Sequence, residues 1–196
     1  METIPRSVQS ETDGSPGQAF NRHMRLKLWK KAKRVDAAFN SLYDRLRPSV
    51  VPPTTSECDQ CLETLLPRRL PHGNITEQQM RDSLLADYTM LGKVAGALMK
   101  MQEDCEYNGR LHRRMLSAET LTKQLMCQIG QALPSGGGEF PCSPLHPVLM
   151  SWCHTDNCFD WNIRNFIAMD KLISTSQAVK TKYNRLLSSH VIRCEH

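Results

Sequence analysis

Cysteine side chains gather in two segments of this chain and could bind a metal ion. The first segment is CDQC, residues 58–61, in which two thiolates on a tight turn can reach one tetrahedral zinc ion. The second is PCSPLHPVLMSWCHTDNC, residues 141–158. A complete zinc site needs a second pair of ligands, and the last two cysteines of this segment are the best match. We therefore predict a zinc site formed by Cys58, Cys61, Cys153 and Cys158.

Other states of these cysteines stay open. Cys153 and Cys158 are separated by four residues, which is wider than a standard zinc knuckle, so Cys142 or His154 could replace one of them. The same thiols could be buried as small apolar groups, or they could form disulfides if the protein is exported. Two further cysteines fall near helical apolar stripes and are expected in the core: Cys105 and Cys127.

A run of cations at residues 21–34, NRHMRLKLWKKAKR, is the candidate partner-binding surface. Most of these side chains lie off the apolar stripe of the same segment. A basic amphipathic helix can contact nucleic-acid phosphates, an anionic membrane surface or an acidic protein, and KKAKR resembles a short nuclear import signal. The alternative is an ordinary solvated helix face. We expect an acidic protein or a nucleic acid to bind Arg22, Arg25, Lys27, Lys30, Lys31, Lys33 and Arg34.

Sequence patterns of familiar enzyme sites are missing from this chain. It contains no G-x-S-x-G, H-E-x-x-H, phosphate-loop, dinucleotide-binding or zinc-deaminase pattern. Cys153 and His154 are adjacent, whereas a catalytic cysteine and histidine normally come from distant positions. We therefore predict that the protein is not an enzyme.

The segments that carry these residues are predicted to be helical. The first helix runs from about residue 18 to residue 46, and Pro48 stops it. Its apolar positions recur in steps of four and three, which places them on one side of a helix. They are Leu28, Ala32, Val35, Phe39, Leu42 and Leu46.

Three further helices are predicted. The second starts at Thr76, which forms a capping box with Gln79, and ends near residues 108–109, an Asn-Gly pair. The third continues to Pro134, and one long helix across residues 108–109 is an alternative. The fourth starts at residue 156 or 157 and extends as far as Val191.

The lengths of the connections predict how these helices are arranged. The first and third connections are long, roughly 29 and 24 residues, whereas the second is very short. A short connection makes its two helices antiparallel, and long connections permit parallel neighbours, as in the up-up-down-down bundles of helical cytokines. We predict an all-α fold, a four-helix bundle-like core with two long irregular Cys/Pro-rich connections.

Composition places the chain among ordinary globular proteins. It has 196 residues, 40% of them hydrophobic, and a net charge of +5. Residues 1–17 are predicted to be a disordered polar tail and residues 18–196 a single helical domain. The sequence contains neither a recognisable signal peptide nor an apolar run of about 18 residues. We therefore expect no transmembrane segment and a location in the nucleus, the cytoplasm or both.

Two functional hypotheses follow from these patterns. The first is a non-enzymatic regulatory or adaptor protein that binds another macromolecule through its basic first helix, with zinc joining the two long connections. The alternative is a helical cytokine-like receptor ligand that lacks a signal peptide, in which the cysteines form disulfides. The number of free thiols distinguishes the two hypotheses.

Overall fold

The computed structural model describes residues 21–46, 62, 77–104, 109–133, 140–141 and 158–188, and the side chains of 77, 78, 104 and 158–162 are not described. This part of the chain is helical and contains no strand, which confirms the all-α prediction. Its long helices are α1 (Arg22–Leu46), α3 (Glu77–Asp104), α4 (Gly109–Ala132) and α5 (Cys158–Ser188). None of these helices includes a stretch both long and apolar enough to cross a membrane.

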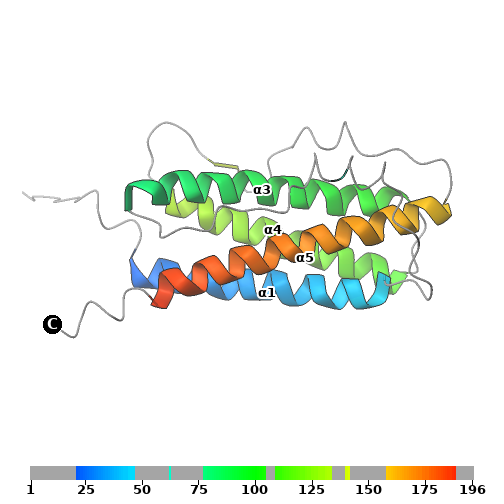
Figure 1. Cartoon of the computed structure of the whole chain (residues 1–196), viewed down its shortest axis with the longest axis horizontal. Coiled ribbons are helices and arrows are strands. Elements are labelled where there is room, and N and C mark those ends of the chain that lie inside the picture. The colour runs from blue at the N-terminus through cyan, green and yellow to red at the C-terminus, as the bar shows by residue number, and fades with distance from the viewer. Residues whose placement is uncertain are drawn as a thin grey trace, which may run out of the picture.

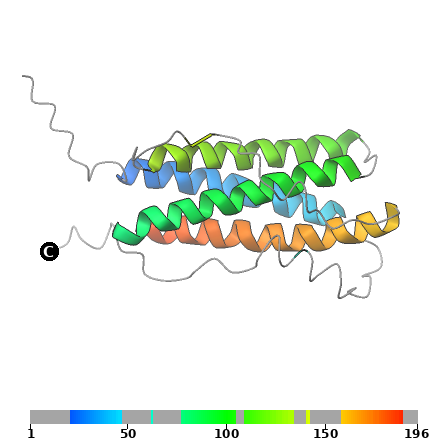
Figure 2. The same cartoon turned by 90° about the horizontal axis from the view of Figure 1, so that it is seen from above.

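The four helices pack side by side into a bundle with an up-up-down-down order (Figures 1 and 2). The helices α1 and α3 run in one direction, and α4 and α5 run in the other. The helix α1 packs against both α4 and α5, and α3 packs mainly against α4. Because the end of α1 and the start of α3 lie at opposite ends of the bundle, the intervening chain must return along its length (Figure 1). The same holds between α4 and α5.

The first helix begins one residue after its cap. The Asn21 side-chain oxygen accepts a hydrogen bond of 3.0 Å from the backbone N–H of Met24, which satisfies one free donor of the first turn. The apolar stripe is buried as predicted, except that Leu46 is only half-buried. A charged residue, Asp36, is buried beside the stripe. Residues 18–20, where the predicted helix started, lie outside the described residues.

The second and third predicted helices are separate. The helix α3 ends at Asp104 and α4 begins at Gly109, so the single long helix considered for this region is not formed. The fourth helix begins at Cys158, directly after the predicted cap region, and is described as far as Ser188. The predicted extension to Val191 lies outside the described residues.

The core runs along the centre of the bundle and is made of leucine, methionine, alanine and a few aromatic side chains. Phe39 of α1, Leu98 of α3, Leu125 of α4 and Leu172 of α5 are all fully buried. Each comes from the apolar stripe of its helix, so the 3.6-residue period alone decides which side of each helix faces inward.

Two residues of the third connection also pack onto the bundle. The ring of Phe140 meets the ring of Tyr88 on α3 edge-on, with centroids 5.4 Å apart. The Tyr88 hydroxyl donates to the carbonyl of Pro141, and the Phe140 side chain lies over Gly130 of α4. This connection therefore crosses the helix pair α3–α4 at its beginning.

Candidate interaction surface

The exposed cations of α1 form the clearest charged feature of the structure. Five of the predicted partner-binding residues are exposed to solvent: Arg22, Lys27, Lys30, Lys33 and Arg34. The apolar stripe of α1 faces the core, so the amphipathic pattern itself turns these side chains outward. The structure therefore places them where a partner could contact them.

The other two predicted residues connect helices. The Arg25 guanidinium donates a hydrogen bond of 3.1 Å to the backbone carbonyl of Leu186 on α5. The Lys31 ammonium donates to the side-chain oxygen of Gln124 on α4 at 2.7 Å. Both cations are half-buried, so part of their hydrogen-bonding capacity already holds the bundle together.

Among the helices that the structure describes, acidic side chains do not pair with the exposed cations of α1. Asp36 turns toward α5, where its carboxylate accepts from the Lys180 ammonium at 2.5 Å and from the Ser176 hydroxyl at 3.2 Å. Within the described part of the chain, no ion pair involves Arg22, Lys30 or their exposed neighbours on α1. The surface therefore presents positive charge and hydrogen-bond donors, which suit an anionic partner.

The aromatic residue of this segment lies at the edge of the surface. Trp29 is half-buried and packs against the core. The Lys33 ammonium lies 5.6 Å from the centroid of its ring, within the range of a cation–π contact. The ring thus has neighbours within the fold and is only partly available to a partner.

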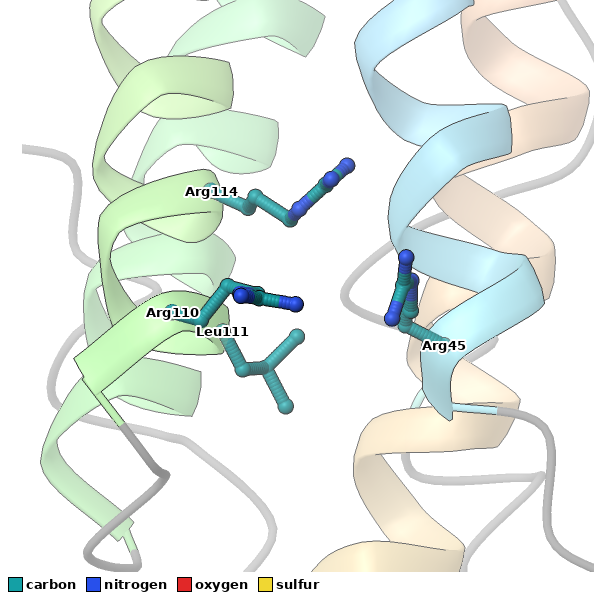
Figure 3. Close-up of a pocket in the computed structure, with 4 residues that line it drawn as sticks. All are labelled: Arg45, Arg110, Leu111 and Arg114. Atoms are coloured by element: carbon teal, nitrogen blue, oxygen red, sulfur yellow. The ribbon is translucent and has the colours of Figure 1, made fainter.

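A second cationic feature, which the sequence analysis did not identify, lies where the end of α1 meets the start of α4. A pocket of about 400 Å³ is lined there by Arg45, Arg110, Leu111 and Arg114. Figure 3 shows Arg110 and Arg114 extending from α4 toward α1, with Arg45 on the facing helix. The Arg114 guanidinium donates a hydrogen bond of 2.5 Å to the Ser41 hydroxyl, which fixes its position. The one-turn spacing of the α4 arginines is visible in the sequence, but the approach of Arg45 depends on packing.

The predicted zinc site falls mostly outside the described residues. This applies to Cys58, Cys61 and Cys153, and the side chain of Cys158 is not described although the residue begins α5. Among the side chains that the structure does describe, no three His, Cys, Asp or Glu residues are grouped to hold a metal ion. Zinc at these cysteines stays a prediction.

One cysteine differs from its expectation. Cys127 was expected to be a core thiol, but it is only half-buried and is bonded in a disulfide. Its partner is not among the cysteines whose side chains are described. The position follows from the helical period, because Thr120 and Gln131, which share the side of α4 that carries Cys127, are both exposed. The disulfide therefore attaches another segment to the outer side of α4.

A buried polar cluster between α3 and α5 was also missed by the sequence analysis. One carboxylate oxygen of Asp87 accepts hydrogen bonds of 2.7 Å from the Lys182 ammonium and the Tyr183 hydroxyl. Burial raises the pKa of Asp87, although Lys182 and Tyr183 act in the opposite direction. Burial and the adjacent carboxylate hold the pKa of Tyr183 well above its ordinary value, so its hydroxyl remains a donor.

The geometry of this cluster indicates a structural role. Its carboxylate is almost fully buried, and the Lys182 ammonium also donates to the backbone carbonyl of Ser83 at 3.1 Å. These contacts hold α3 and α5 at one fixed position along each other. A signal was present in the sequence, because Asp87 interrupts the apolar stripe between Leu84 and Leu91.

No family model, curated protein or solved structure matches this chain. Its function therefore has to be argued from its own helices, charges and cysteines.

Proposed function

We propose that this protein is a non-enzymatic receptor ligand of the helical-cytokine type. The observation that carries the proposal is the up-up-down-down order of its four helices (Figure 1). Two connections must each return along the length of the bundle to produce this order, which is the arrangement of growth-hormone and cytokine bundles. The order alone does not fix the function, because one fold can serve several.

The disulfide of Cys127 supports the same proposal. Disulfides persist in oxidising environments and are rare in the reducing cytosol and nucleus. A bundle whose outer side is covalently tied to another segment is suited to the extracellular space. The ligand hypothesis therefore places the protein outside the cell, in contrast to the location expected from the sequence alone.

Free thiols, counted in denatured and unreduced protein, give the first test of this proposal. The ligand hypothesis requires at least two disulfides, so that no more than four of the eight cysteines react with a thiol reagent. Eight reactive thiols in protein purified from an oxidising compartment would contradict it.

Binding to intact cells gives the second test. Labelled protein should bind saturably to responsive cells, and both unlabelled protein and prior protease treatment of the cells should abolish the signal. Binding that neither treatment reduces would contradict a receptor ligand, whatever the state of the thiols.

A second candidate function rests on the exposed cations of α1. An intracellular adaptor in the nucleus or cytoplasm could use Arg22, Lys30 and their neighbours to bind an acidic protein or nucleic acid. Cys58 and Cys61 would then hold zinc together with Cys153 and Cys158. Stoichiometric zinc in protein that contains eight free thiols would favour this candidate over the ligand.

A further inference from the structure

We propose that the outer surface of the helix pair α1–α4 binds a sulfated polysaccharide, and that the arginine pocket holds one of its sulfate groups. This proposal concerns a different ligand from the receptor and does not depend on receptor binding. The surface, called here the α1–α4 face, consists of Lys27, Lys31, Arg34, Arg45, Arg110 and Arg114.

The α1 side of this face is a single row of residues. Successive members are separated by four, three, seven and four residues, so they share one side of the helix. Two contacts place that side next to α4: Lys31 donates to Gln124, and Ser41 accepts from Arg114. The row consists of Lys27, Lys31, Arg34, Ser41 and Arg45.

The α4 side of the face begins with the two pocket arginines and continues with polar amides. Arg110 and Arg114 are one turn apart. Further along the same side, the Gln128 amide lies 3.1 Å from the sulfur of Met24 on α1. The two helices are antiparallel neighbours, so the face extends along both of them (Figure 2).

The acidic side chains of these two helices do not neutralise the face. Glu119 of α4 is turned toward α3, where it accepts from Gln102 at 2.9 Å and pairs with Lys123 at 2.5 Å. Asp36 of α1 is turned toward α5. Asp44 of α1 is exposed and next to Arg45 in the sequence, but among the described residues no ion pair involves Asp44 or the cations of the α1–α4 face.

The pocket suits one tetrahedral oxyanion. Three arginines line it, and an anion held between like charges lowers their mutual repulsion. Each guanidinium is a planar fork of N–H donors that can bind two oxygens of the same group. Arg114 is already positioned by Ser41, so less conformational entropy is lost when an oxyanion binds.

The chemistry of the face favours a sulfated polysaccharide over nucleic acid. Single-stranded nucleic acids bind through stacking on aromatic side chains as well as through phosphate contacts. The helix α4 has no Phe, Tyr or Trp, and Tyr43 of α1 stacks on Phe166 of α5 with centroids 5.1 Å apart. The Cys127 disulfide also indicates an oxidising environment, where sulfated polysaccharides are the abundant polyanions.

The binding test compares two triple variants that remove the same charge. Arg45→Gln with Arg110→Gln and Arg114→Gln alters the pocket, and Arg81→Gln with Lys93→Gln and Arg185→Gln is the matched control on α3 and α5. Affinity for a heparin oligosaccharide is measured by fluorescence anisotropy at two salt concentrations. We expect the pocket variant to bind about tenfold more weakly and the control to change by less than about twofold.

Further variants separate the pocket from folding and from general charge. The double variant Arg45→Gln with Arg110→Gln leaves the Arg114–Ser41 bond intact, and circular dichroism should show an unchanged helix content. The triple variant Arg45→Lys with Arg110→Lys and Arg114→Lys keeps the charge but loses the planar fork of donors, so it should keep only part of the affinity.

Three results would overturn the proposal. They are the absence of heparin binding at low salt, an equal loss of affinity in the pocket and control variants, and tighter binding of duplex or single-stranded nucleic acid than of heparin at the same ionic strength. A receptor-binding assay on cells whose sulfated polysaccharides have been removed with heparinase is independent of all three, so this proposal and the receptor-ligand proposal can fail separately.

Discussion

At the residue scale, the most informative feature is the buried cluster around Asp87. A carboxylate and an ammonium group are both removed from water between α3 and α5, which is costly unless they meet with good geometry. Lys180 and Lys182 lie on opposite sides of α5 and contact Asp36 of α1 and Asp87 of α3, respectively. These two contacts fix the rotation and register of α5 between its neighbours.

Replacing Lys182 by methionine should destabilise the fold at neutral pH, because it leaves the Asp87 carboxylate buried without its counter-ion. The expected loss is about 3–5 kcal/mol in the free energy of unfolding. Burial already raises the pKa of Asp87, and losing the cation raises it further. Below about pH 3.8, Asp87 is protonated in both the folded and the unfolded protein, so no buried charge lowers the free energy of unfolding. That stability is lost as pH rises through the raised pKa of the folded state.

Urea unfolding of the Lys182→Met variant at several pH values between about 4 and 7 measures this effect. The variant should lose most stability relative to wild type at neutral pH and least at the acidic end. The double variant with Asp87→Asn removes the carboxylate as well, so its difference from wild type should not widen toward neutral pH. A loss in Lys182→Met that is the same at every pH would contradict the role assigned to Asp87.

Two glycines of α4 provide a matched test of how tightly the third connection packs. A Cβ atom at Gly109 would meet no heavy atom within 4 Å, whereas one at Gly130 would lie 3.0 Å from the Cβ of Phe140. Alanine favours a helix over glycine by up to about 1 kcal/mol. We expect Gly109→Ala to be neutral or stabilising and Gly130→Ala to be less favourable, because Phe140 must move.

Thermal unfolding of the two glycine variants compares them directly. An equal or greater gain in melting temperature for Gly130→Ala would show that Phe140 yields without cost.

At the element scale, the apolar stripes account for most of the stability of the bundle. Leu98 of α3 is fully buried, whereas Leu116 of α4 is 48% exposed, although both are helical leucines. Leu98→Ala should lower the free energy of unfolding by about 2–5 kcal/mol, and Leu116→Ala should change it by less than about 0.5 kcal/mol. Equal effects in urea unfolding would contradict the assigned core.

The helix boundaries show why sequence patterns locate elements well. The break between α3 and α4 falls at the predicted Asn-Gly pair, and α5 begins next to the predicted cap region. These signals are local, because capping and helix-breaking residues act on the turn that contains them. At the start of α1, Asn21 is a cap that the apolar period does not reveal, and residues 18–20 of the predicted helix lie outside the described residues.

At the scale of the whole molecule, the disulfide of Cys127 joins the outer side of α4 to another part of the chain. A crosslink of this kind restricts the unfolded chain and typically contributes about 2–4 kcal/mol. Cys127→Ser should therefore unfold at lower urea concentration than the wild type. It should also expose one additional thiol to an alkylating reagent, detected by mass spectrometry, because the partner cysteine becomes free. No additional thiol would contradict the bond.

The sequence by itself determined the helical class, the position of each helix and the side of each helix that is buried. These properties depend on periodicity and on residues a few positions apart, such as the stripe from Leu28 to Leu42. The connection lengths also predicted the up-up-down-down order that the structure shows. The same reasoning wrongly placed Cys127 in the core as a free thiol. The period of a helix does not show which other segment is bonded to its outer side.

Only the tertiary structure decided which side chains meet across helices. Arg45 and Arg110 are far apart in the sequence, yet they line one pocket because α1 and α4 are antiparallel neighbours. Asp87 and Lys182 meet for a similar reason, since their contact depends on the register of α3 against α5. Register and direction arise from the packing of all four helices together, and no local sequence period encodes them.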